Sequence, residues 1–114
     1  MGGEFIAFSQ SEGWLRTRFP VRQEFLNPYR TMQGGMIAAA VDNTLGPLSM
    51  LVAPPNVTRR LEMKYSRPVR GDMGHILVFA RFIGRETQEL RFTSEVRSEE
   101  GVLLARAKAT HWIT

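Results

Sequence analysis

The chain has 114 residues, too few for two stable cores, so we expect one domain over residues 1–114. It contains no cysteine, which excludes disulfides, cysteine-ligated zinc and a thiol nucleophile. The net charge of +4 at pH 7 serves either solubility or the attraction of an anionic ligand. The basic residues are scattered and are not interleaved with aromatic residues, so nucleic acid is not an expected partner.

The chain shows no pattern of secretion or membrane insertion. Its amino terminus has neither a basic leader nor a long apolar core. The most apolar stretch, residues 36–53, is interrupted by Asp42, Asn43 and Gly46, and it falls short of the roughly 20 apolar residues that a membrane span needs. We therefore predict a cytoplasmic protein without a membrane partner.

The first predicted strand covers residues 14–21, where aromatic residues and threonine mix with arginines. A loop over residues 22–32 follows, and one helix then begins at Gly34 and ends before Pro54. Five apolar residues of this helix recur at spacings of three and four, which places them on one face. They are Ile37, Val41, Leu45, Leu48 and Val52. Alanines cover much of the remaining surface, so we expect other structure to wrap the helix.

The rest of the chain is strand-like. Residues 57–67 alternate apolar and charged side chains, residues 76–83 and 89–96 form a hairpin around a turn at 84–87, and residues 102–113 form the last strand. The inner face of that last strand is predicted to carry Leu103, Ala105, Ala107 and Ala109. One helix on an antiparallel sheet is an α+β fold. A sheet this small cannot wrap the helix completely, so we expect a second copy to cover the rest.

Asp42 is the only charged residue between Thr31 and Thr58. Its neighbours on the helix, Ala38 and Leu45, place it beside the apolar stripe. A carboxylate in that position requires a hydrogen-bond partner. It is either a structural carboxylate bonded to a loop or a partner chain, or a general base or nucleophile in a partly dry cleft.

Gly34 and Gly35 stand at the helix start, where backbone amides lack intrahelical partners and the helix dipole favours negative charge. Glycine also lets a ligand approach the backbone closely. With Asp42 about two turns further on, the pattern predicts an oxyanion-stabilising end and a carboxylate that attacks or activates water. Upstream, Asn27 either caps the turn at Pro28 or contributes to the site.

The two histidines, His75 and His111, fall in predicted strands that we expect to lie far from this motif. With two histidines and no acidic cluster, no metal site is expected.

The segment 27–42 resembles the signature of hotdog-fold acyl-CoA thioesterases of the phenylacetate-pathway type, within the 4-hydroxybenzoyl-CoA thioesterase-like superfamily. Those proteins show an asparagine, then histidine-glycine-glycine six residues on, then an aspartate nine residues after the histidine. The spacing here is the same. Residues 57–61, 65–71 and 102–110 also resemble the family pattern, so the resemblance covers most of the chain. It implies a hotdog fold, in which a five- to six-stranded antiparallel sheet wraps one long central helix.

The resemblance also implies roles for individual residues. The amide of Gly34 would polarise the thioester carbonyl, with Gly35 beside it in the substrate-binding loop. Asp42 would be the base that activates water, or the nucleophile that forms a mixed anhydride. Asn27 would orient the water or the carbonyl, and Thr58, from the neighbouring subunit, would help to place the water.

Three further residues complete the candidate site. Arg67 and Arg70 have the charge to contact coenzyme A phosphates, although solvated loop arginines are an equal alternative. Gln33 stands where the signature more often has histidine. Glutamine donates and accepts hydrogen bonds but is not an acid near neutral pH.

Taken together, the resemblance implies hydrolysis of a small or medium acyl-CoA to free acid and coenzyme A. It also implies a homodimer or homotetramer and no cofactor other than the coenzyme A of the substrate. The alternative is a non-catalytic acyl-CoA binding or sensing domain, which Gln33 favours. A dehydratase or hydratase ranks lower, since it needs a histidine or a different acidic motif on the helix.

Overall fold

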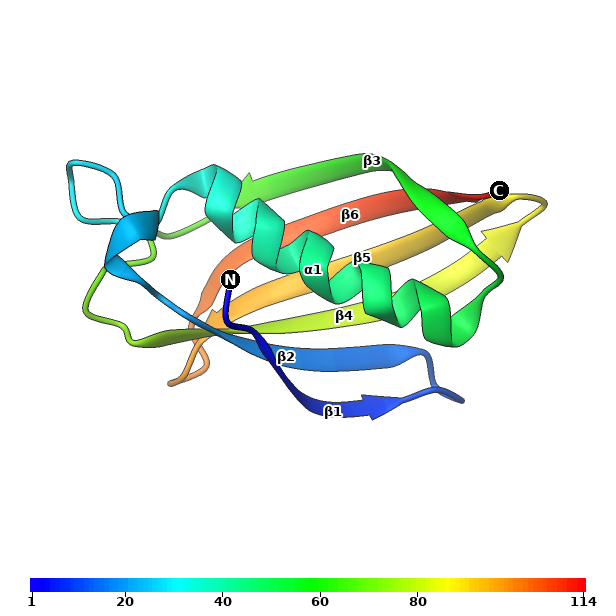
Figure 1. Cartoon of the computed structure of the whole chain (residues 1–114), viewed down its shortest axis with the longest axis horizontal. Coiled ribbons are helices and arrows are strands. Elements are labelled where there is room, and N and C mark those ends of the chain that lie inside the picture. The colour runs from blue at the N-terminus through cyan, green and yellow to red at the C-terminus, as the bar shows by residue number, and fades with distance from the viewer.

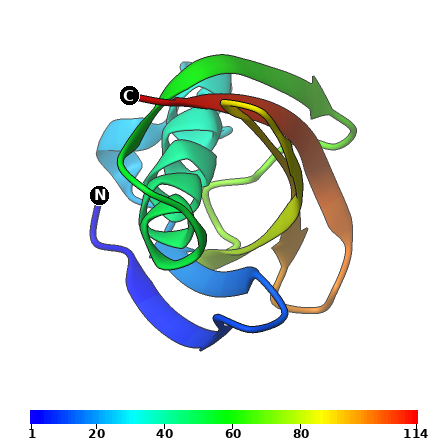
Figure 2. The same ribbon diagram turned by 90° about the vertical axis from the view of Figure 1, so that its right-hand side faces the viewer.

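A computed structural model describes residues 1–114 as six strands, one α-helix and one short 3-10 helix. In chain order the elements are β1 (Glu4–Ser9), β2 (Trp14–Pro20), η1 (Gln23–Phe25), α1 (Gly34–Val52), β3 (Asn56–Tyr65), β4 (His75–Glu86), β5 (Glu89–Ser98) and β6 (Leu103–Ile113). All strands join one sheet in the order β1-β2-β4-β5-β6-β3, and every pairing is antiparallel. The helix α1 crosses one face of this sheet, which curls around it (Figures 1 and 2). The predicted α+β architecture is confirmed.

The largest differences from the predicted strands concern β1 and the hairpin of β4 and β5. The strand β1 was not predicted, because its large apolar side chains do not alternate between a buried and an exposed face: Phe5 and Phe8 are 67% and 59% exposed. The hairpin of β4 and β5 is longer than expected. Its strands pair as far as Glu86 and Glu89, so only Thr87 and Gln88 form the turn.

The core lies between α1 and the concave face of the sheet. The predicted apolar face of the helix is confirmed, with Ile37, Val41, Leu45 and Leu48 at most 3% exposed and Val52 half-buried. On β6 the predicted inner alanines are buried as well. Leu103 was expected to face inward with them, but an irregularity in the pairing of β5 with β6 leaves Leu104 as the more buried of the two leucines.

The opposite face of α1 is open in the single chain. Asp42 and Asn43 are exposed there, and Met50 is 80% exposed. By length and composition alone this helix would be able to cross a membrane, more readily than the sequence suggested, with a mean hydropathy of 1.3. In the structure its buried face packs on the sheet of its own chain, as the core helix of a globular domain does.

Candidate active site

The start of α1 presents free backbone amides. Gln33 precedes the helix in an extended conformation, and its carbonyl oxygen accepts hydrogen bonds from the amides of Met36 and Ile37 at 2.9 and 3.1 Å. The amides of Gly34 and Gly35 donate to no turn or loop, and helix geometry leaves them without an intrahelical acceptor. They point outward from the positive end of the helix dipole. This end of α1 can therefore accept an oxygen that carries or develops negative charge.

The two glycines have different surroundings. The hydroxyl of Tyr65, at the end of β3, donates to the carbonyl oxygen of Gly34 at 2.6 Å. A Cβ atom on Gly34 would lie 3.2 Å from that tyrosine ring, whereas a Cβ atom on Gly35 would meet nothing within 4 Å. Burial raises the pKa of Tyr65 above its ordinary value, so the hydroxyl stays a donor at neutral pH. Tyr65 thus fixes Gly34 and leaves Gly35 open to a ligand.

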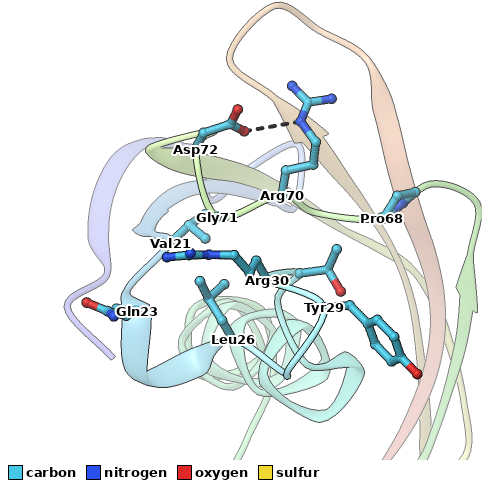
Figure 3. A pocket seen from close by; sticks show the side chains of 10 residues that line it. Val21, Gln23, Leu26, Tyr29, Arg30, Pro68, Arg70, Gly71 and Asp72 are labelled. Carbon is cyan, nitrogen blue, oxygen red and sulfur yellow. Dashed lines mark hydrogen bonds and ion pairs between the residues drawn. The ribbon is translucent and has the colours of Figure 1, made fainter.

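The Gly34 end borders a depression of about 280 Å³ that also includes Arg67 and Pro68. Pro68 in turn borders a larger cleft of about 770 Å³, drawn in Figure 3. Arg30 and Arg70 line this cleft from two different loops, and Arg70 is paired through Nε with Asp72 at 3.1 Å. Of the two predicted arginines, Arg67 therefore lies at the helix start, and Arg70 lines the adjoining cleft. Arg30, which the sequence did not single out, joins them.

Asn27 holds its own loop together. Its Oδ1 accepts hydrogen bonds from the amides of Tyr29 and Thr31 at 3.0 and 3.1 Å, and from the Thr31 hydroxyl at 3.1 Å. This is the turn-capping role that Asn-Pro sequences favour. The Nδ2 group makes no hydrogen bond within the chain and is free to donate to a ligand.

The side chain of Gln33 does not stabilise the helix start. It is exposed and makes no capping hydrogen bond to the helix. The motif therefore presents backbone donors at this position and no acid.

Asp42 belongs to a cluster of four polar side chains, which we call the Asp42 cluster: Asp42, Asn56, Thr58 and His111. The Thr58 hydroxyl donates to Asp42 Oδ1 at 3.2 Å and also lies 3.3 Å from His111 Nε2. The other ring nitrogen, His111 Nδ1, lies 2.8 Å from Asn56 Oδ1. Thr58 is thus the hydrogen-bond partner that the Asp42 carboxylate requires. The helix α1 and the strands β3 and β6 each contribute residues to the cluster.

One expectation is corrected here, and another is made more specific. Thr58, which was expected from the neighbouring subunit, bonds Asp42 of its own chain because β3 passes beside the middle of α1, so these two residues belong to the same end of the site. His111 was expected far from the motif, which is wrong: a single side chain separates it from Asp42. The antiparallel pairing of β3 with β6 places Thr58 opposite His111 although 53 positions separate them.

A β-bulge explains why alternation did not reveal this contact. The inward side chains Leu61 and Met63 of β3 have odd numbers, so Thr58 reads as outward. The register shifts between Thr58 and Arg60, with Arg59 as the extra residue. The guanidinium of Arg59 lies on the outer side of the sheet, 4.0 Å from the centre of the Trp112 ring. One signal was readable: His111 continues the inward odd-numbered series of the β6 alanines.

His111 is almost completely buried, at 1% exposure, and its ring centre lies 4.8 Å from that of Phe92. Burial lowers the pKa of His111 below its ordinary value, and the charge of Asp42 opposes part of this effect. The imidazole is therefore neutral at pH 7 and can accept a proton. The side-chain end of the site thus combines a carboxylate, a hydroxyl and a neutral imidazole.

The two ends of the site are separated along the helix. Eight residues from Gly34 to Asp42 correspond to about 12 Å. The free amides also point away from Asp42, since helix N–H groups are directed toward the amino-terminal end. One chain thus presents an anion-accepting end and an acid–base end that do not face one common point. No group of three or more histidine, aspartate or glutamate side chains is placed to hold a metal ion.

The architecture is that of the hotdog thioesterases of the phenylacetic acid degradation type, which confirms the fold and the resemblance drawn from the sequence. No protein-family model matches the chain, and no curated protein sequence matches it either.

Solved structures similar to this chain include three of particular relevance. A phenylacetic acid degradation-related protein of Ralstonia eutropha JMP134, described as a proposed thioesterase, has a TM-score of 0.89 at 27% identity, over 97% of this chain and 84% of that one. A Streptococcus mutans UA159 protein bound to acetyl-CoA has a TM-score of 0.91 at 20% identity, over 100% and 90%. The phenylacetic acid degradation protein PaaI of Thermus thermophilus, as a mutant, has a TM-score of 0.88 at 24% identity, over 99% and 94%.

Proposed function

We propose that this protein is an acyl-CoA thioesterase that hydrolyses a small or medium acyl-CoA to free acid and coenzyme A. The observation that carries the proposal is the combination of free amides at the start of α1 with the Asp42 carboxylate further along the same helix, which accepts a hydrogen bond from the Thr58 hydroxyl of β3. The fold supports it, since the Ralstonia eutropha relative is described as a proposed thioesterase and the Streptococcus mutans relative holds acetyl-CoA.

In the proposed reaction, the amide of Gly34 binds the thioester carbonyl oxygen and stabilises the negative charge that develops on it. Asp42 takes a proton from a water molecule that Thr58 helps to hold, and the water oxygen attacks the carbonyl carbon. The carbon–sulfur bond then breaks, and the coenzyme A sulfur leaves with the electron pair and takes up a proton. We favour Asp42 as the base over Asp42 as the nucleophile, because its partner Thr58 is a group that can also hold the water.

We infer that two copies of the chain share each site. Along one helix the Gly34 amide and Asp42 are about 12 Å apart and do not converge. The strand β3, which carries Thr58, is an edge strand that pairs only with β6. Unpaired edges are natural sites of association. A second copy joined along β3 would set the Gly34 end of one chain against Asp42 of the other, and would cover the open face of α1.

The coenzyme A part of the substrate would lie along the arginines beside the helix start. Arg67 borders the depression at Gly34, and Arg30 and Arg70 line the adjoining cleft in Figure 3. Guanidinium groups bind phosphate oxygens with two parallel hydrogen bonds. The free Nδ2 of Asn27 would donate to the carbonyl or the water. A cytoplasmic location and a tetramer built from two dimers stay predictions.

The test is the release of free thiol from short, medium, long and aromatic acyl-CoAs. We expect one class to be hydrolysed, and Asp42→Asn to lower kcat by about 10²- to 10⁴-fold with an unchanged circular dichroism spectrum. Glu100→Gln, which removes an exposed carboxylate in the turn between β5 and β6, is the matched control and should keep full turnover. Near-wild-type turnover by Asp42→Asn would remove Asp42 from the mechanism.

A non-catalytic acyl-CoA binder is the second candidate, and the idle side chain of Gln33 favours it. In that case acyl-CoA would bind in calorimetry while no thiol is released from any member of the panel. This outcome would replace the thioesterase proposal.

A further inference from the structure

The hydrogen bonds of the Asp42 cluster fix where its protons lie. Asn56 Nδ2 donates to the carbonyl oxygen of Pro54 at 2.9 Å, so it is Asn56 Oδ1 that faces His111. Because Oδ1 only accepts, His111 Nδ1 must carry the proton of that 2.8 Å contact. In the neutral ring, Nε2 is then a bare acceptor that faces Thr58.

Thr58 therefore has one proton and two acceptors. Its oxygen lies 3.2 Å from Asp42 Oδ1 and 3.3 Å from His111 Nε2. While the ring is neutral and Asp42 is ionised, one of the two contacts lacks a proton. When the ring gains a proton on Nε2, that nitrogen donates to Thr58, Thr58 donates to Asp42, and every contact of the cluster is satisfied. The cluster is thus arranged to accept one additional proton at His111.

We propose that His111 is a positioning residue that stores the proton that Asp42 takes from the attacking water, with Thr58 as the bridge. This proposal rests on the proposed thioesterase function. When the water oxygen bonds to the carbonyl carbon, its proton passes to Asp42. Asp42 passes a proton to the Thr58 oxygen, and Thr58 gives its own hydroxyl proton to His111 Nε2. The proton returns by the same path to the coenzyme A sulfur as the carbon–sulfur bond breaks, and every group regains its starting state.

The surroundings of His111 allow its imidazole both to take up and to release a proton. On β5, the residue opposite it is Leu90, and Phe92 packs against the ring, so this strand presents no charge. From β3 it meets the neutral side chains of Asn56 and Thr58. Asp42, on α1, is the one charged group that acts on it. The buried ring releases its proton readily, and Asp42 alone favours the charged form. His111 also brings an imidazole to the site, which the glutamine at position 33 does not.

The coupling can be tested without any activity, by NMR titration of the imidazole groups. The chain has two histidines, and His75, which pairs with Glu99 at the surface, is the internal control. We expect Asp42→Asn to move the titration midpoint of His111 down by about 1 pH unit, because an attracting charge is lost, and to leave His75 in place. An unchanged His111 midpoint would overturn the proposal.

The role in turnover is tested by the dependence of kcat on pH. We expect kcat of the wild type to fall at low pH as His111 becomes protonated before the reaction, and His111→Gln to be at least tenfold slower without this acid limb. Asn56→Asp places a carboxylate against Nδ1 and should move both the NMR midpoint and the acid limb to higher pH. If His111 had only a structural role, the acid limb of the kcat profile would not move. An acid limb that stays in place in Asn56→Asp while the NMR midpoint moves would therefore refute proton storage by His111. If the wild type hydrolyses no acyl-CoA, the proposed function fails, while the titration still decides whether Asp42 and His111 are coupled.

Discussion

The two ends of the candidate site differ in the kind of chemical group that they present to a ligand. At the start of α1 the active groups are backbone amides, and the neighbouring side chains only hold or frame them. In the Asp42 cluster, side chains from α1, β3 and β6 depend on one another through hydrogen bonds of 2.8 to 3.3 Å. At the backbone end the side chain of Gln33 makes no capping hydrogen bond to the helix, whereas each member of the cluster has a specific partner to lose.

This difference also suggests how the site divides its tasks. The helix start holds no group that titrates near neutral pH, so it can only bind and polarise. In the proposed reaction, proton transfer falls to the Asp42 cluster, two helical turns away. A complete site needs one end of each kind, and the following four predictions test that division in order of decreasing effect.

Mixing two inactive variants tests the sharing of sites between chains. Gly34→Pro removes the amide proton while suiting the first position of a helix, since Gln33 before it is extended. Refolded with Asp42→Ala chains, half of the dimers carry one intact site, so about a quarter of the wild-type activity should return. Each variant alone should be inactive. If thiol release from the mixture stays at the level of the separate variants, each site lies within one chain.

Charge removal beside the helix start tests the binding role. Arg67→Gln should raise KM for the acyl-CoA about tenfold, as expected for the loss of one charge-assisted hydrogen bond to phosphate. Arg70→Gln should have a smaller effect, because Arg70 is already paired with Asp72. The control substrate is the matching acyl-pantetheine, which lacks the nucleotide phosphates. An equal rise of KM for both substrates would mean that Arg67 acts on the acyl end or on folding.

The two glycines should respond differently to a methyl group. On Gly34 it meets Tyr65 at 3.2 Å and disturbs the hydrogen bond to the Gly34 carbonyl, whereas on Gly35 it enters open space. We expect the free energy of unfolding of Gly34→Ala to lie about 1 kcal/mol below that of Gly35→Ala. Urea denaturation measures the difference. Equal stability of the two variants would show that Tyr65 does not secure the helix start.

The buried histidine should make stability depend on pH. The pKa of His111 is lowered in the folded chain, so as the pH falls below about 6.5 the unfolded chain binds a proton before the folded chain does. The contribution of neutral His111 is complete above that pH and is lost as the pH approaches the folded-state pKa. The urea midpoint of the wild type should therefore fall more steeply from about pH 6.5 to pH 5 than that of His111→Gln. Parallel curves for the wild type and His111→Gln would contradict the lowered pKa.

Much of the fold was readable because the signals are local. The apolar spacing on α1 and the alternation on β3, β5 and β6 come from burial against one core, and they predicted the helix and the later strands. The strand β1 escaped detection because it lies at the sheet edge with Phe5 and Phe8 exposed. An edge strand with no buried face leaves no alternation to detect.

The site was readable only in part for a related reason. The spacing of Gly34 and Asp42 is a property of one helix, so it was predicted directly. The partner of Asp42 depends on how β3 pairs with β6, and on a bulge that reverses the expected face of Thr58. Pairing across 53 positions is set by the whole sheet. His111 was therefore misjudged, and Arg30 was missed, because its position in the cleft depends on two loops meeting.

The extra residue at Arg59 has a consequence for how such a site can vary. A bulge bends its strand and increases its twist, and here the bend lies beside the residue that reaches Asp42. Removing Arg59 would keep Thr58 opposite His111 in the ladder but would straighten β3 and draw the hydroxyl away from the helix. The length of a strand, and not the chemistry of a side chain, would then set the strength of an acid–base contact. The insertion or deletion of one residue at this position would then change the contact between Thr58 and Asp42 while every functional side chain stays the same.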